Sequence, residues 1–149
     1  MSVIGEAASI AGIIGLAGQA IQAASAVYNL LEAYRRVSSR VLEIQEEIAS
    51  LQQILEGVAT LGTQSSESAT AQLTDLHTSV LKCQSVLEQL KMRLQPLKIT
   101  STGFKRFFKK AKLAADTEYF STISHQIHLC RADVSLHLEL LQRYIYSSW

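Results

Sequence analysis

The amino-acid sequence predicts an all-α protein, a helical bundle of four long helices plus a short basic helix before the last one. Three observations predict this fold class. Helix-breaking residues are scarce, with one proline and seven glycines in 149 residues. The most common side chains favour helix over sheet. Apolar residues recur at alternating intervals of three and four along four long segments, which is the period of an amphipathic helix. The length fits a single domain over residues 1–149 that buries its own core.

The first predicted helix is free of charge, because residues 7–31 contain no Asp, Glu, Lys or Arg. Its apolar positions keep the three-four rhythm: Ile10, Ile14, Ala17, Ile21, Ala24, Tyr28 and Leu31. Gly12, Gly15 and Gly18 lie among them. Each glycine inside a helix costs about 1 kcal/mol relative to alanine, so this helix is weak on its own. Small residues also permit close backbone approach, so we expect the helix to run through the centre of the bundle.

The same segment is long enough to span a bilayer. However, it is rich in Ala, Gly and Ser, and three amphipathic helices would need it as their fourth partner. A permanent transmembrane anchor is therefore disfavoured. A secretory signal peptide is also disfavoured, since the only early charge is that of Glu6 rather than a basic cluster.

The second and third helices have clear apolar seams. The second seam consists of Val37, Val41, Ile44, Ile48, Leu51, Leu55 and Val58. The third consists of Leu73, Leu76, Val80, Cys83, Leu87, Leu90 and Leu94. A polar loop rich in Ser and Thr, residues 63–70, separates two helices of similar length, which suggests an antiparallel hairpin. Glu43, Glu46 and Glu47 of the second helix are expected on its solvated face.

The last helix follows a basic segment, residues 98–112, which has no acidic residue. At helical spacing Phe104, Phe107 and Phe108 share one face of this segment, and basic side chains flank them. In one interpretation the rings cap the bundle and the lysines are simply solvated. In another, the segment meets an anionic membrane surface. Nucleic acid is disfavoured as a partner, because the net charge of the chain is only +1. The last helix carries the seam Phe120, Ile123, Ile127, Cys130, Val134, Leu138, Leu141 and Ile145.

The sequence shows no catalytic or metal-binding pattern. Phosphate-binding loops and nucleophile elbows are absent. His125, His128 and His137 lie on one helix at spacings that do not all share a face, so no metal site is predicted. Cys83 and Cys130 fall on apolar faces and are expected to be buried free thiols. We therefore expect no enzyme activity, no metal and no cofactor.

Several stretches resemble the HeLo-like N-terminal domains of fungal STAND/NLR-type receptors. The resemblance rests on residues 4–14, on residues 41–48, on the Ser/Thr-rich loop and on the basic aromatic stretch 104–110, where phenylalanine replaces the tryptophan often seen in that family. HeLo-like domains are helical bundles similar to the four-helix executioner domain of the mixed-lineage kinase-like necroptosis protein. The resemblance covers nearly the whole chain.

The resemblance implies a cell-death effector that oligomerises and permeabilises the plasma membrane through its N-terminal helix. Such domains are cytoplasmic until a sensor, NACHT-type or amyloid-motif region in the same or a partner protein triggers self-association. Carried onto this chain, the candidate membrane-inserting residues are Ile10, Gly12, Ile13, Ile14, Gly15 and Gly18. The candidate residues for an anionic lipid surface are Lys105, Arg106, Phe107, Phe108, Lys109, Lys110 and Lys112. The alternative is a non-lytic oligomerisation or adaptor module of such a receptor.

Overall fold

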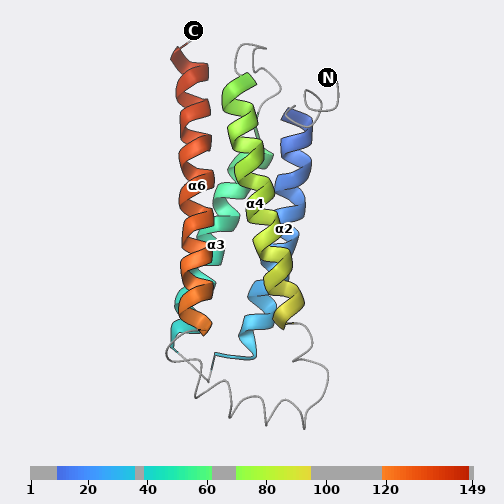
Figure 1. Cartoon of the computed structure of the whole chain (residues 1–149), viewed down its shortest axis with the longest axis vertical. Coiled ribbons are helices and arrows are strands. Elements are labelled where there is room, and N and C mark those ends of the chain that lie inside the picture. Colours follow the sequence, from blue (N-terminus) through green and yellow to red (C-terminus); the bar gives the residue numbers. More distant parts are fainter. Residues whose placement is uncertain (1–9, 36–38, 62–69, 95–118, 148–149) are drawn as a thin grey trace.

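The computed structural model describes residues 10–35, 39–61, 70–94 and 119–147, and these form four helices (Figure 1). They are α2 (Ile10–Glu32), α3 (Arg40–Ala59), α4 (Thr70–Leu94) and α6 (Tyr119–Ser147). The all-α bundle of four long helices is thus confirmed, and no strand occurs within the described ranges. The short basic helix expected before the last one falls in 95–118, outside the described residues.

The helices occupy the corners of a square. In Figure 1, α2 and α4 run in one direction, and α3 and α6 run in the other. The closely packed pairs are α2 with α3, α2 with α4, α4 with α6, and α3 with α6. Consequently α2 lies diagonally opposite α6, and α3 lies diagonally opposite α4.

This arrangement corrects two expectations. α2 is a corner helix, not a central one, because it packs closely on α3 and α4 only. The second and third long helices are antiparallel, but they face each other across the diagonal and do not form a packed hairpin. The matched helix lengths were compatible with either placement. The deciding factor is that α2 and α6 fill the two positions between them.

The core follows the predicted seams closely in α3 and α4. Every seam residue of α3 within the described ranges is buried, and so is every seam residue of α4. In α6 the buried seam residues are Phe120, Ile123, Ile127, Val134 and Leu141. Each large aliphatic side chain removed from water stabilises the fold by about 1.5–3 kcal/mol. At one end of the bundle, the ring of Tyr34 packs edge-on against Phe120, with ring centroids 5.9 Å apart.

Candidate functional site

α2 buries a face that is rotated from the predicted one. The buried residues are Ile10, Ile13, Ala17, Ala20, Ala23, Ala24, Val27, Leu30 and Leu31. Four of the predicted seam residues are among them, but Ile14, Ile21 and Tyr28 are only partly buried. The seam prediction for α2 was therefore half right.

The middle of the α2 interface is made of alanine. Between Ile13 and Val27, every buried residue is an alanine. A buried methyl group contributes about 0.8 kcal/mol, well below the contribution of a buried leucine or isoleucine. The facing helix α3 buries Val, Ile and Leu together with a single polar side chain, Gln45. The fully buried positions in the middle of α2 therefore contribute less apolar surface than those of α3, while Ile14, Leu16 and Ile21 add partly buried contacts with the core.

Gly15 and Gly18 of α2 do not serve close packing within the bundle. Gly15 is exposed and Gly18 is partly buried, and a Cβ atom added at either position would meet nothing within 4 Å. The small residues that face the neighbouring helices are the alanines. The expectation that glycine allows close approach here is wrong for Gly15 and Gly18. These glycines weaken the helix without a packing reason in the folded domain.

Replacing Gly15 with alanine should stabilise the folded domain. The new methyl group meets no neighbour, and alanine loses less backbone entropy in a helix. We expect Gly15→Ala to raise the free energy of unfolding by about 1 kcal/mol, measured by urea denaturation. The matched control is Ala49→Gly at an exposed position of α3, which should lower it by a similar amount. A destabilised Gly15→Ala protein would show that this glycine has a structural role in the bundle.

The exposed side of α2 carries no charge before its last residue. The exposed residues are Ala11, Gly15, Gln19, Gln22, Ser25, Asn29 and Glu32. Two of these make uncharged hydrogen bonds to neighbouring helices. Gln52 Nε2 of α3 donates to Ser25 Oγ at 2.7 Å, and Gln84 Nε2 of α4 donates to Gln19 Oε1 at 2.8 Å. Both bonds are exposed, so water can replace them at little net cost when α2 moves.

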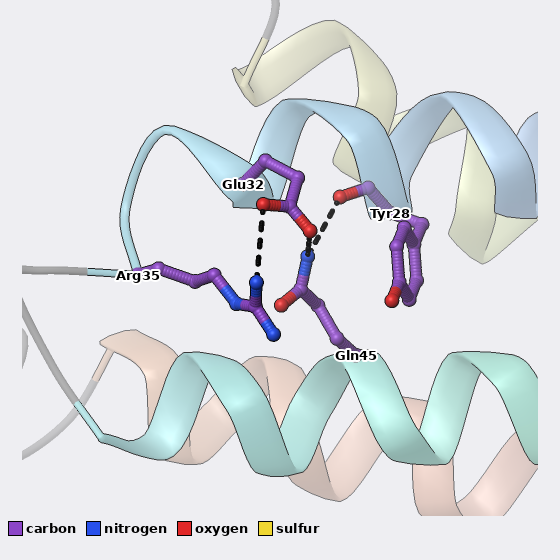
Figure 2. Close-up of polar contacts among 4 residues, drawn as sticks. All are labelled: Tyr28, Glu32, Arg35 and Gln45. Carbon is purple, nitrogen blue, oxygen red and sulfur yellow. Dashed lines mark hydrogen bonds and ion pairs between the residues drawn. The ribbon is translucent and has the colours of Figure 1, made fainter.

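A buried glutamine fixes the C-terminal end of α2 (Figure 2). Gln45 of α3 is 1% exposed, and its Nε2 donates to the carbonyl oxygen of Tyr28 at 3.1 Å and to Glu32 Oε1 at 3.0 Å. Glu32 also pairs with Arg35 at 3.5 Å on the surface. Gln45 Oε1 is buried and has no hydrogen-bond partner among the described residues. The amide therefore joins α2 to α3 at one end of α2 while half of its own hydrogen-bonding capacity is unused.

Among the described helices, only α2 is long and apolar enough to cross a membrane, with a mean hydropathy of 1.5 over its best window. Its 23 residues span roughly 35 Å, compared with about 30 Å for the hydrocarbon core of a bilayer. In the bundle, 33% of that window is buried. A core helix of a soluble protein passes the same test of length and composition, so this property alone does not define a membrane segment.

The structure describes one of the two predicted sites and leaves the other outside. Ile10, Gly12, Ile13, Ile14, Gly15 and Gly18 all lie on the first three turns of α2. They do not share one face, because Ile10 and Ile13 are buried whereas Gly15 is exposed. Lys105, Arg106, Phe107, Phe108, Lys109, Lys110 and Lys112 lie outside the described residues.

Sequence reasoning missed a charged contact between α3 and α6. Arg131 Nε donates to Glu47 Oε2 at 2.7 Å, and His128 Nδ1 lies 3.6 Å from Glu47 Oε1. Glu47 was expected on a solvated face, but its side chain is only 28% exposed. Glu47 lies at the edge of the α3–α6 interface. The sequence alone did not show that α3 and α6 are neighbours. Gln45 was also missed, although its spacing of four from Val41 and three from Ile48 places it on the apolar face.

Metal ligands do not converge in the part of the chain that the structure describes. No group of three or more His, Cys, Asp or Glu residues there could hold a metal ion. His128 lies beside Glu47, and His137 Nε2 lies 3.4 Å from Asp133 Oδ1 one turn away on the same helix.

Four packed helices, with a charge-free first helix at one corner, define a compact helical-bundle domain. The chain belongs to the family described as pigment biosynthesis cluster protein PigL N-terminal, whose family model matches residues 5–139. This is a helical domain associated with fungi. No curated protein and no solved structure matches the chain.

Proposed function

We propose that this domain is a membrane-targeting cell-death effector. In the proposal the domain is cytoplasmic at rest, self-associates when an attached or partner sensor region acts, and moves to the plasma membrane. There α2 leaves the bundle and enters the bilayer, which becomes permeable. The proposal contains no catalytic step, no cofactor and no nucleic acid.

The observation that carries the proposal is that α2 is a packed helix of the bundle and also has the length and composition of a membrane-spanning helix. It is a corner helix of a folded bundle, and it is also charge-free, 23 residues long and apolar enough to cross a membrane. α2 can leave by losing its contacts with α3 and α4, while the α3–α6 and α4–α6 contacts remain.

The energetics of α2 support its release. The fully buried positions at its centre are alanine, its exposed hydrogen bonds through Gln19 and Ser25 are uncharged, and Gly15 and Gly18 lower its helix propensity without a packing benefit. In a bilayer, small residues are instead useful, because they let helices approach closely in lipid. The same residues therefore weaken the bundle state and favour association of inserted helices.

The resemblance to HeLo-like domains and the basic segment support a membrane as the target. Lys105, Arg106, Lys109 and Lys110 add positive charge next to Phe107 and Phe108 in the sequence. Each basic residue near an anionic membrane surface contributes about 1 kcal/mol of attraction, and phenylalanine enters the interface readily. This predicts a preference for membranes that contain anionic lipids.

Leakage from dye-loaded vesicles tests the proposal. The full chain is fused to a tetrameric coiled coil to force association and is added to vesicles with or without phosphatidylserine. We expect the tetramer to release at least tenfold more dye from anionic vesicles than from neutral ones, and the unfused chain to release little. Intact anionic vesicles in the presence of the folded tetramer would refute the lytic mechanism.

A second candidate function is a non-lytic assembly module, and the outer face of α6 favours it. Leu129, Leu136 and Leu140 are spaced by seven and four, so they share one face, and they are 52%, 51% and 44% exposed. Leu140 also lines an open groove of 370 Å³ beside His137. Such a stripe suits association with another helix. This function predicts oligomers that neither bind vesicles nor release dye.

A further inference from the structure

The interface between α4 and α6 contains one polar side-chain contact and, one helical turn away, two neighbouring thiols. The two helices are antiparallel neighbours, so residues one turn later on α4 face residues one turn earlier on α6. Ser79 Oγ of α4 donates to Asp133 Oδ2 of α6 at 2.7 Å. One turn along in the same register, Cys83 of α4 lies beside Cys130 of α6. Both cysteines are free.

The two thiols differ in access and in charge. Cys83 is fully buried, and Cys130 is partly exposed. The neighbouring Cys83 thiol lowers the pKa of Cys130, although burial and the nearby Asp133 oppose this effect. The Cys130 side chain, together with burial, raises the pKa of Cys83. Cys130 is thus the less buried thiol of the pair and the one whose pKa is lowered, which favours it as the nucleophile, and Cys83 lies beside it.

The surroundings of this pair do not suit a metal. Asp133 is engaged by Ser79 and by His137, and no metal-binding group of three or more ligands occurs within the described ranges. A zinc site would need four converging ligands. Two adjacent thiols with one accessible member instead have the arrangement of an attacking and a resolving cysteine.

We propose that Cys130 and Cys83 form a peroxide-responsive pair that cross-links α4 to α6 through an intramolecular disulfide. The Cys130 thiolate attacks one oxygen of hydrogen peroxide, the O–O bond breaks, and Cys130 becomes a sulfenic acid as hydroxide leaves and takes up a proton. The Cys83 sulfur then attacks the Cys130 sulfur, loses its proton, and water leaves as the S–S bond forms. In sum, two thiols and one peroxide give one disulfide and two waters.

The cross-link has a defined structural consequence. It fixes α4 to α6 and leaves α2 and α3 unattached, so it forms whether or not α2 enters membranes. It closes a long stretch of chain, which restricts the unfolded state. We expect the oxidised protein to melt at a higher temperature than the reduced protein, by on the order of 10 °C.

Mass spectrometry of the full chain tests the proposal. Reduced protein is treated with a small excess of hydrogen peroxide, blocked with iodoacetamide, and analysed intact and as peptides without reductant. We expect a monomer that has lost two hydrogens, takes up no iodoacetamide and yields one linked peptide pair containing Cys83 and Cys130. Dithiothreitol should restore both thiols and the lower melting temperature. Two alkylated thiols after peroxide, or disulfide-linked dimers in place of the monomer, would overturn the proposal.

Two variants assign the roles within the pair. In Cys83→Ala, peroxide should leave a sulfenic acid at Cys130 that dimedone traps, and the melting temperature should not rise. In Cys130→Ala, the buried Cys83 should react with peroxide at least tenfold more slowly than Cys130 does in Cys83→Ala. Equal rates in the two folded variants would contradict the assigned order of reaction. The peptide map of the unmodified chain decides whether the disulfide forms even if a variant loses stability.

Discussion

Tethering α2 to α3 should abolish dye release while the bundle stays folded. Gln52 Nε2 and Ser25 Oγ lie 2.7 Å apart across these two helices, on the exposed side of the contact. In a Cys83→Ala/Cys130→Ala background, Ser25→Cys and Gln52→Cys introduce two thiols across this contact. A short bis-methanethiosulfonate reagent joins them, and dithiothreitol removes the bridge. Because α2 then cannot leave its neighbour, we expect at least a tenfold loss of release from anionic vesicles.

A tether that leaves α2 untouched provides the matched control. Arg40 Nη1 of α3 donates to Ser121 Oγ of α6 at 3.2 Å, so cysteines at positions 40 and 121 join those two helices by the same chemistry. This protein should still release dye in the tethered form. If both tethers block release equally, the whole bundle must open and the exit of α2 alone is not the mechanism.

A lysine at position 18 should suppress membrane insertion and leave the bundle folded. A Cβ atom added at Gly18 would meet nothing within 4 Å, so we expect the folded domain to accommodate the longer side chain. In a bilayer the same charge near the middle of α2 costs about 2.5–3.5 kcal/mol. Each 1.4 kcal/mol is a factor of ten, so the insertion equilibrium falls on the order of 100-fold. Dye release by the forced tetramer measures the effect.

Gly18→Met is the appropriate comparison, because methionine is an unbranched side chain of similar length without a charge. We expect Gly18→Lys to release at least tenfold less dye than Gly18→Met at equal protein concentration. Circular dichroism and thermal melting show whether both variants are folded. Equal release by the two variants would mean that this part of α2 stays in water during leakage.

The sequence predicted α3 and α4 well because their faces differ sharply in polarity. Leucine, isoleucine and valine stand at seam positions, and polar side chains occupy most of the others, so only one rotation of each helix buries the apolar set. In α2 the apolar set is wider than the buried face, since Ile14, Leu16 and Ile21 are only partly buried, so more than one rotation fits its pattern. Its rotation is set by the shape of its two neighbours, and the buried series therefore shifted from Ile14 and Ile21 to Ile13, Ala20 and Val27.

The contacts that matter for the site depended on which corners the helices occupy. The pairing of Glu47 with Arg131 needs α3 beside α6, and the meeting of Cys83 with Cys130 needs α4 beside α6. Helix lengths and seams do not distinguish these placements from a simple hairpin of α3 and α4. The candidate helix itself was evident from its missing charges, whereas the open space around Gly15 and Gly18 appeared only with the packed neighbours in place.

The most direct test of α2 release is the dye release of one tethered sample before and after reduction. The tetramer with cysteines at positions 25 and 52 cross-linked is incubated with anionic vesicles, and dithiothreitol is then added to the same cuvette. We predict no release while α2 is held to α3, followed by release at the rate of the untethered protein once the bridge is cut. Release at the full rate before reduction would contradict the proposal that α2 leaves the bundle to enter the membrane.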